Sequence, residues 1–280
     1  MKVGVVGLGT MGAGIAQIAV QAGDDVVGRE VTDELGAKAR ERIEHFLARA
    51  VDKGRMSAED RDAALGRLRT TTSLDDLAGC DLVVEAIVEE LDAKRELFRE
   101  LDRICRPGAI LATNTSALSV TEIAEATERP ERVIGMHFFN PAPVLPLVEI
   151  VRTVGSDEAV VDAAYEWAER AGKRPVRCND TPGFIVNRIL IPLLNDCVRV
   201  LDEADVTPED LDKALTNGAG WPMGPCALLD LIGIDVHVHA SEALHAKIAE
   251  ERMAPPERLR EMQAAGTLGR KTGSGFFEYE

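Results

Sequence analysis

The chain has 280 residues, of which 45% are hydrophobic and 29% charged, which is the composition of a soluble globular protein with one large or two medium domains. Its formal net charge of −16 excludes nonspecific nucleic-acid binding and an anionic membrane surface as partners. Because no window resembles a membrane span or a signal segment, and five scattered cysteines form no C-x-x-C pair, we expect a cytoplasmic protein with reduced thiols.

The chain begins with a predicted strand, a glycine turn and a helix. The apolar run 3–6 is typical of a buried parallel strand, and apolar residues recur at helical spacing from Ile15 onward. Between them, Gly7-x-Gly9-x-x-Gly12 has the spacing of a dinucleotide-binding turn, in which the first helical turn binds the phosphates. The predicted contacts are Gly7, Leu8, Gly9, Thr10, Met11 and Gly12. The alternative is a purely structural strand–turn–helix.

The rest of the first 180 residues alternates short apolar strands with helices, which predicts a Rossmann-like, doubly wound α/β domain over residues 1–180. The expected strands are 25–30, 81–86, 110–112, 132–136, 147–151 and 175–176. The expected helices are 33–53, a short one capped by Ser57, 91–105 and 157–171.

The pattern changes after Thr181-Pro182-Gly183, which is a strong structural break. The remaining sequence is almost entirely helical in pattern, with one helix start marked by Thr207 as cap and Pro208 at the first position. Further helical segments are expected over 184–201, 227–250 and 257–265. We therefore predict an all-α domain over residues 181–280.

Glu30 follows the second predicted strand, 23 residues after Gly7. An acid at this position hydrogen-bonds the adenosine ribose of NAD and repels the 2′-phosphate of NADP. The alternative is a solvated acid at a strand end. The neighbouring Arg29 keeps NADP open as a second cofactor.

Later strands carry polar residues to the same sheet edge, where α/β proteins bind ligands. This edge has Glu85 to Glu89, the run Asn114-Thr115-Ser116 and His137. Glu149 is embedded in an apolar strand, where an acid is costly unless paired, and His137 is its predicted partner. The alternative places Glu149 on a solvated strand face. His237, His239 and His245 lack the spacing of a metal site, and we expect no metal.

Together these motifs identify a resemblance to the short, single-function 3-hydroxyacyl-CoA dehydrogenases, above all the bacterial 3-hydroxybutyryl-CoA dehydrogenases. The resemblance runs from residue 2 to 279 and is strongest in 7–17, 114–116, 133–148, 181–192, 222–232 and 268–276. It implies four catalytic residues, His137, Glu149, Ser116 and Asn187. The implied NAD contacts beyond the glycine turn are Glu30, Glu89, Lys94, Asn114, Ser116 and Lys271. Its implied CoA contacts are Lys53 and Arg49, and Ser116 and Asn187 position the acyl oxygens.

The implied reaction is reversible NAD-dependent oxidation of a short-chain (S)-3-hydroxyacyl-CoA to the 3-ketoacyl-CoA, in fatty acid and butanoate metabolism. The resemblance also implies a homodimer, with the helical domain closing over the cofactor and forming the interface. The chain departs from the family pattern at Glu30, Gly28, Ala117 and Leu145-Pro146, and Gly28 is expected to loosen packing on the adenine side. Two other hypotheses are an NAD-linked dehydrogenase of a non-CoA hydroxy acid, like the crystallin-related members, and a catalytically idle NAD-binding protein.

Overall fold

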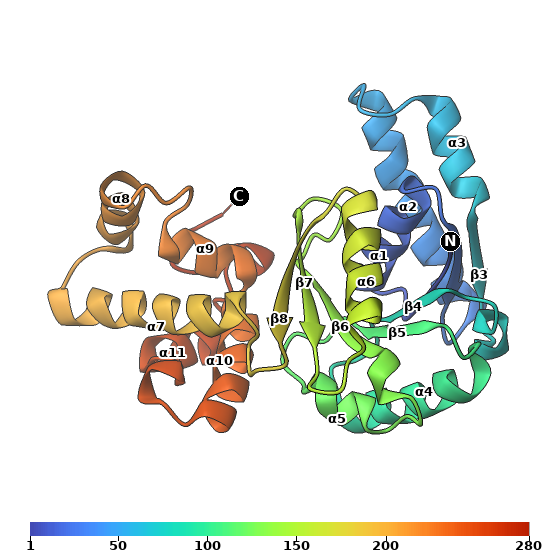
Figure 1. The fold of residues 1–280 in the computed structure, drawn as a ribbon. Helices are drawn as coiled ribbons and strands as arrows, with labels where there is room; N and C mark the ends of the chain where they lie inside the picture. Colours follow the sequence, from blue (N-terminus) through green and yellow to red (C-terminus); the bar gives the residue numbers. More distant parts are fainter. Residues whose placement is uncertain (280) are drawn as a thin grey trace. The chain divides into compact units, whose positions relative to one another are not determined.

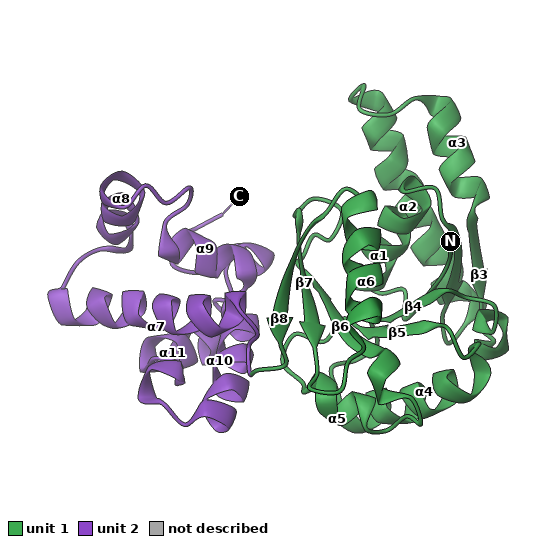
Figure 2. Cartoon of the chain, viewed as in Figure 1, with its two compact units in different colours: residues 1–181 green, residues 182–280 purple. Residues whose placement is uncertain are grey.

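The computed structural model describes residues 1–279 and divides into two compact units, unit 1 (Met1–Thr181) and unit 2 (Pro182–Glu280), coloured separately in Figure 2. Unit 1 is an α/β structure and unit 2 is helical.

Unit 1 is built on one eight-stranded sheet in the order β3-β2-β1-β4-β5-β6-β7-β8. All neighbouring strands are parallel except β6 and β7, which are antiparallel. The chain moves outward from β1 to β3 and then returns to the other side of β1 with β4, so the strand order reverses between β1 and β4. The strands are β1 (Lys2–Val6), β2 (Asp25–Arg29), β3 (Leu68–Thr71), β4 (Leu82–Glu85), β5 (Ile110–Thr113), β6 (Val133–Phe138), β7 (Leu147–Arg152) and β8 (Arg174–Asn179).

Helices cover both faces of this sheet (Figure 1). Alternate strand residues point to opposite faces, so Val5 and Val84 belong to one core and Val6 and Val83 to the other. The first core contains α1 (Thr10–Gln21), α2 (Asp33–Asp52) and α6 (Glu158–Arg170), and the second contains α4 (Leu91–Ile104) and α5 (Val120–Ala124). The remaining helix, α3 (Ala58–Gly66), packs against α2 and is capped by Ser57, whose side chain accepts from Asp60 N.

Unit 2 contains α7 (Val186–Ala204), α8 (Pro208–Gly218), α9 (Pro225–Ile232), α10 (Ile234–Ile248), α11 (Glu257–Ala265) and two short 3₁₀ turns, η3 (Glu251–Met253) and η4 (Arg270–Thr272). Its core is formed by apolar side chains of α7, α9, α10 and α11. Gly233, at φ +100°, separates α9 from α10. Buried Asp230 accepts from the backbone N–H groups of Phe276 and Phe277 and holds the last segment on α9.

The observed elements agree with the sequence prediction in type and differ at some boundaries. The strand β3 and the five-residue helix α5 were not predicted. Nor were the 3₁₀ turns, which in unit 1 are η1 (Leu74–Leu77) and η2 (Pro130–Arg132). None of the helices within residues 1–279 is both long and apolar enough to span a membrane, and all five cysteines are free. Burial raises the pKa of the Cys80 and Cys105 thiols to about 11.

Candidate active site

The glycine turn between β1 and α1 has backbone geometry that only glycine allows. Gly7 has φ +83°, and a Cβ there would lie 2.7 Å from Ala86 O. A Cβ on Gly12 would lie 1.7 Å from Gly7 O, so the helix packs against the turn without a side chain. A Cβ on Gly9 would meet nothing within 4 Å, and no side chain caps the helix start. The first-turn N–H groups of Thr10 and Met11 therefore suit a phosphate, and the turn fits a dinucleotide.

Glu30 follows β2 directly and its carboxylate is turned toward the glycine turn. Its Oε1 accepts from Leu8 N at 2.7 Å, and its Oε2 accepts from Val31 N at 2.9 Å. Arg29 Nε donates to Thr72 O at 3.3 Å, so the guanidinium contacts the segment that follows β3. At this position the Glu30 carboxylate, and not the Arg29 guanidinium, bonds to the turn.

Gly28 does not loosen the packing beside the turn, so this expectation was wrong. A Cβ at Gly28 would lie 2.8 Å from Leu8 Cδ1. Leu8 is only 3% exposed and occupies the space that a side chain on β2 would fill. The prediction failed because the sequence does not show that the Leu8 side chain packs against position 28.

A charged cluster joins the ends of β4 and β5 to α4. Lys94, 1% exposed, donates from Nζ to Glu85 Oε1 at 2.5 Å and lies 3.2 Å from Glu89 Oε2. The other Glu89 oxygen, Oε1, accepts from Thr115 Oγ1 at 2.6 Å and from Ser116 N at 2.8 Å. Burial raises the pKa of the Glu89 carboxyl, but the Lys94 charge and the hydrogen bonds from Thr115 and Ser116 outweigh it and lower that pKa.

Glu85 lies at this edge as expected, but no role was predicted for it from the sequence. It is fully buried, and it also accepts from Ile87 N at 2.7 Å and from Thr113 Oγ1 at 2.7 Å. The available signal was an acid that ends an apolar strand, followed nine residues later by a lysine on the next helix. Such a pair is what a buried acid requires.

His137 and Glu149 face each other across the antiparallel pair β6–β7. His137 Nδ1 lies 2.7 Å from Glu149 Oε2, and the residues are 5% and 0% exposed. The alternative of a solvated face for Glu149 is therefore wrong. Because a carboxylate only accepts, Nδ1 carries the proton and the neutral imidazole has its lone pair on Nε2.

Asn114, at the end of β5, is fixed to the strand that carries His137. Its Oδ1 accepts from Phe138 N at 2.9 Å, and the ring of Phe139 lies 4.4 Å from that of His137. Unit 1 thus brings Asn114, Ser116, Glu89 and Lys94 to the carboxyl ends of β4 to β6, and contacts link the last three.

Two predicted site residues belong to unit 2. Asn187 lies in the first turn of α7, three residues after Phe184, which has positive φ, as does Gly183. Lys271 lies in η4, and its Nζ pairs with Asp235 on α10. Their roles beside the unit 1 residues stay predictions.

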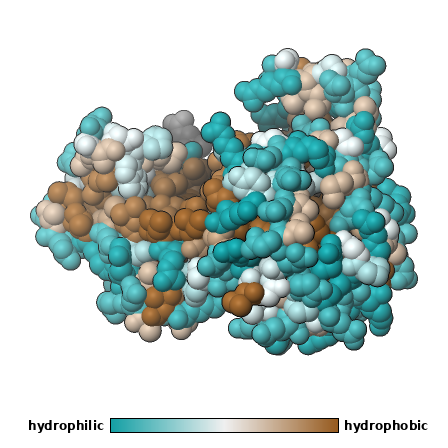
Figure 3. Space-filling view, viewed as in Figure 1, coloured by the Kyte–Doolittle hydropathy of each residue, from teal (hydrophilic) through white to brown (hydrophobic). Residues whose placement is uncertain are grey.

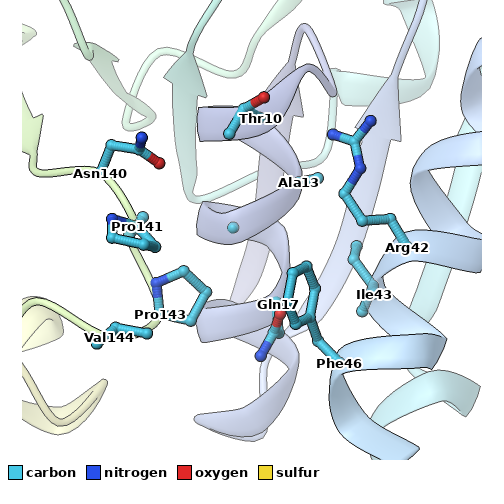
Figure 4. A pocket seen from close by; sticks show the side chains of 12 residues that line it. Thr10, Ala13, Gln17, Arg42, Ile43, Phe46, Asn140, Pro141, Pro143 and Val144 are labelled. Carbon is cyan, nitrogen blue, oxygen red and sulfur yellow. The ribbon is translucent and has the colours of Figure 1, made fainter. Parts of the chain in front are cut away.

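A groove of about 160 Å³ runs along α1 in unit 1 (Figure 4). Asn140, Pro143 and Val144 line one wall, and Arg42 and Phe46 of α2 line the other. Arg49 follows Phe46 by three residues and Lys53 follows Arg49 by four, so all three share a face of α2. Arg49 and Lys53 are exposed, which makes this end of α2 positively charged.

The loop between β6 and β7 forms the first wall and is held from two sides. Lys173 donates from Nζ to Ala142 O at 2.6 Å and to Leu145 O at 3.0 Å, and burial lowers its pKa. On the α1 side, a Cβ at Gly14 would lie 3.0 Å from Pro143 Cδ, so glycine lets the loop approach the helix. The groove wall is therefore fixed within unit 1.

Residues 2–181 match the family described as 3-hydroxyacyl-CoA dehydrogenase, NAD binding domain, and residues 183–279 match 3-hydroxyacyl-CoA dehydrogenase, C-terminal domain.

Individual relatives match over their full length. The chain is 45% identical to the 3-hydroxybutyryl-CoA dehydrogenase of Mycobacterium tuberculosis, covering 99% of this chain and 98% of that protein. It is 43% identical to a probable 3-hydroxybutyryl-CoA dehydrogenase of Deinococcus radiodurans, covering all of both chains. Among solved structures, the (S)-3-hydroxybutyryl-CoA dehydrogenase of Ralstonia eutropha matches with a TM-score of 0.96 and 40% identity, over 100% of this chain and 99% of that one.

Proposed function

The chain belongs to the 3-hydroxyacyl-CoA dehydrogenase family and is an NAD-dependent oxidoreductase, and from this premise we propose that its substrate is a short-chain (S)-3-hydroxyacyl-CoA, 3-hydroxybutyryl-CoA above all. The products are the 3-ketoacyl-CoA and reduced cofactor. The observation that carries the proposal is the buried His137–Glu149 pair on the same sheet as a dinucleotide-binding turn. The 40–45% identity to 3-hydroxybutyryl-CoA dehydrogenases over their full length supports the short acyl chain.

His137 is the general base in this proposal. Its Nε2 accepts the proton of the substrate hydroxyl during oxidation and returns it during reduction, because imidazole changes charge near neutral pH. Glu149 holds the Nδ1–H tautomer and stabilises the imidazolium that forms. Ser116 and Asn187 position the C3 oxygen and the thioester carbonyl, and a misplacement of about 1 Å in such a step costs ~100-fold in rate.

NAD, when bound, supplies the acceptor for the hydride that leaves C3. The glycine turn would hold its pyrophosphate, and Glu30 its adenosine ribose. Asn114, Glu89 and Lys94, together with Lys271 of unit 2, are the proposed contacts of the nicotinamide half. Because the Glu30 carboxylate is bonded to the turn, it favours NAD over NADP by repelling a 2′-phosphate.

The groove along α1 is the proposed path of the CoA arm. Its lining of Pro143, Val144 and Phe46 suits the apolar parts of a pantetheine chain. Beyond it, Arg49 and Lys53 supply the positive charge that the CoA phosphates require on a chain of net charge −16.

Unit 2 is the proposed dimerisation and substrate-closing domain. Large apolar side chains of its helices are exposed, including Ile189 at 61%, Leu231 at 51% and Val236 at 51%. Figure 3 shows hydrophobic side chains gathered along α7. Apolar patches of this kind are typical of protein–protein interfaces, and a second copy of this chain is the proposed partner.

One assay tests the proposed reaction. Purified protein is given acetoacetyl-CoA and longer 3-ketoacyl-CoAs with NADH or NADPH, and the loss of reduced cofactor is followed. We expect turnover with acetoacetyl-CoA and NADH, less with longer chains and little with NADPH. Turnover of a free hydroxy acid in place of the CoA ester would contradict the proposal, as would NADH binding with no turnover of any substrate.

A further inference from the structure

Glu85 places a buried carboxylate at the point where the strand order of the sheet reverses. Its register partners are Val6 on β1 and Thr113 on β5, so it lies at the carboxyl end of the strand on one side of the crevice. Doubly wound sheets bind their ligands at this crevice. A carboxylate with 0% exposure is costly unless its charge is balanced, so the balance of charge around Glu85 decides what it does.

That balance is incomplete. Lys94 is the one ammonium shared by Glu85, at 2.5 Å, and Glu89, at 3.2 Å. Within residues 1–279 neither carboxylate forms an ion pair with another cation. The lowered pKa of Glu89 keeps it ionised at neutral pH. The cluster Glu85–Lys94–Glu89 therefore has two carboxyl groups for one ammonium.

The position of the cluster determines which half of the cofactor it faces. Glu30, on the β2 side of the crevice, is the proposed contact of the adenosine ribose. The β4–β5 side then receives the nicotinamide half, because a dinucleotide spans the two halves of such a sheet. Glu89 also bonds the Ser116 backbone on this side. The nicotinamide ring is a cation in NAD⁺ and neutral in NADH, so nearby excess negative charge acts on the two forms differently.

We propose that the Glu85–Lys94–Glu89 cluster stabilises the oxidised cofactor relative to the reduced one, with buried Glu85 supplying the charge that Lys94 leaves unbalanced. This role rests on the proposed placement of the cofactor. Thr113 and Ile87 donate hydrogen bonds to Glu85, and these bonds alone do not require a negative charge near the cofactor. The proposal gives this charge a function. The group acts through its charge, without touching the substrate.

The test measures binding, and not turnover. The dissociation constants of NAD⁺, NADH and ADP-ribose, which lacks the nicotinamide ring, are determined for the unaltered chain and for Glu85→Gln. We expect the Kd of NAD⁺ to rise roughly tenfold relative to that of NADH, the size of one unit charge acting at a separation of several ångströms. The Kd of ADP-ribose should not change. An equal change in the Kd of all three nucleotides would overturn the proposal, because a residue that only positions the site would produce it. No change in any Kd would also overturn the proposal.

Two further variants keep the test decisive. Thr113→Val removes a hydrogen bond to Glu85 without changing any charge, and it should leave the NAD⁺ to NADH ratio unaltered. If Glu85→Gln does not fold, as judged by circular dichroism, Glu89→Gln removes one charge from the same cluster and should shift the ratio in the same direction. Failure of the unaltered chain to bind any of the three nucleotides would instead refute the proposed cofactor site.

Discussion

His137 Nδ1 lies 2.7 Å from Glu149 Oε2, and the two residues are directly opposed in the β6–β7 register. Both residues lie within paired strands, and this pairing fixes the orientation of the imidazole. The register of β6 and β7 determines this pairing, because a shift of one residue in the register would turn the Glu149 side chain to the opposite face of the sheet.

Glu149→Gln tests what this pair does. Glutamine keeps the shape but cannot stabilise the imidazolium, and it permits the wrong tautomer, so we expect kcat to fall by about 100-fold or more while the Kd of NADH stays unchanged. Stopped-flow and steady-state assays with acetoacetyl-CoA measure the first quantity and fluorescence titration the second. The control is Glu158→Gln, an exposed acid on α6. Near-normal kcat would show that Glu149 is only structural.

Arg49→Ala and Lys53→Ala test the proposed CoA path. Each removes one cation from the exposed end of α2, so the KM for acetoacetyl-CoA should rise about five- to tenfold with little change in the KM for NADH. Added salt should weaken the effect, because these charges are exposed. Arg103→Ala provides the control, since Arg103 is exposed on α4, over the opposite face of the sheet. An equal effect at Arg103 would mean that only net charge matters.

Glu30→Gln tests cofactor choice. The neutral amide no longer repels a 2′-phosphate, so the ratio of kcat/KM with NADH to that with NADPH should fall about tenfold. Glu34→Gln removes an exposed acid from the first turn of α2 and serves as the control. If the two variants gave the same ratio as the unaltered chain, Glu30 would have no part in the selection.

Buried His237 predicts an acid-sensitive unit 2. Burial lowers its pKa to about 4, and its Nε2 bonds to Asn195 at 2.8 Å. Between about pH 6.5 and 4 the unfolded chain binds a proton that the folded chain does not, so the free energy of unfolding should fall by up to about 3 kcal/mol as pH drops through this window. Urea unfolding at pH 7, 6 and 5 measures this loss. His237→Gln should reduce the slope and exposed His45→Gln should not; equal slopes in all three proteins would contradict the prediction.

Val236→Asp tests the proposed dimer interface. A charge placed on the exposed apolar surface of unit 2 should shift the protein from dimer to monomer, because an unpaired buried carboxylate is costly at an interface. Light scattering after size-exclusion chromatography gives the mass. Val154→Asp makes the same substitution at a fully exposed residue of unit 1 and should leave the mass unaltered. A monomer in the unaltered chain would refute the interface outright.

The sequence predicted the elements that have strong periodicity or caps. The apolar run before Gly7 and the long stripe of α2 were sufficient, and Thr207 with Pro208 marked the start of α8. In contrast, β3 has one buried residue in four and lies at the sheet edge, so it has no apolar pattern to detect. The helix α5 has five residues and too little length for a helical period.

The candidate site could likewise be predicted only in part from the sequence. The pairing of His137 with Glu149 was predicted because an acid in an apolar strand needs a partner, and a single histidine lay nearby in the predicted sheet. Glu85 shares this signal, but its partner Lys94 lies on a helix that the sequence alone does not orient. The contacts of Leu8 with Gly28, and of the β6–β7 loop with Gly14, depend on the tertiary packing of distant segments.

The contact between Leu8 and position 28 restricts the substitutions that this protein can tolerate. A methyl group at position 28 would lie 2.8 Å from a Leu8 methyl carbon, so strand and turn share one fixed volume. Enlarging residue 28 alone should push the turn out of the conformation in which Leu8 N reaches Glu30. Shortening residue 8 at the same time should return that space. We therefore expect a larger residue at position 28 to be tolerated only together with a smaller residue at position 8.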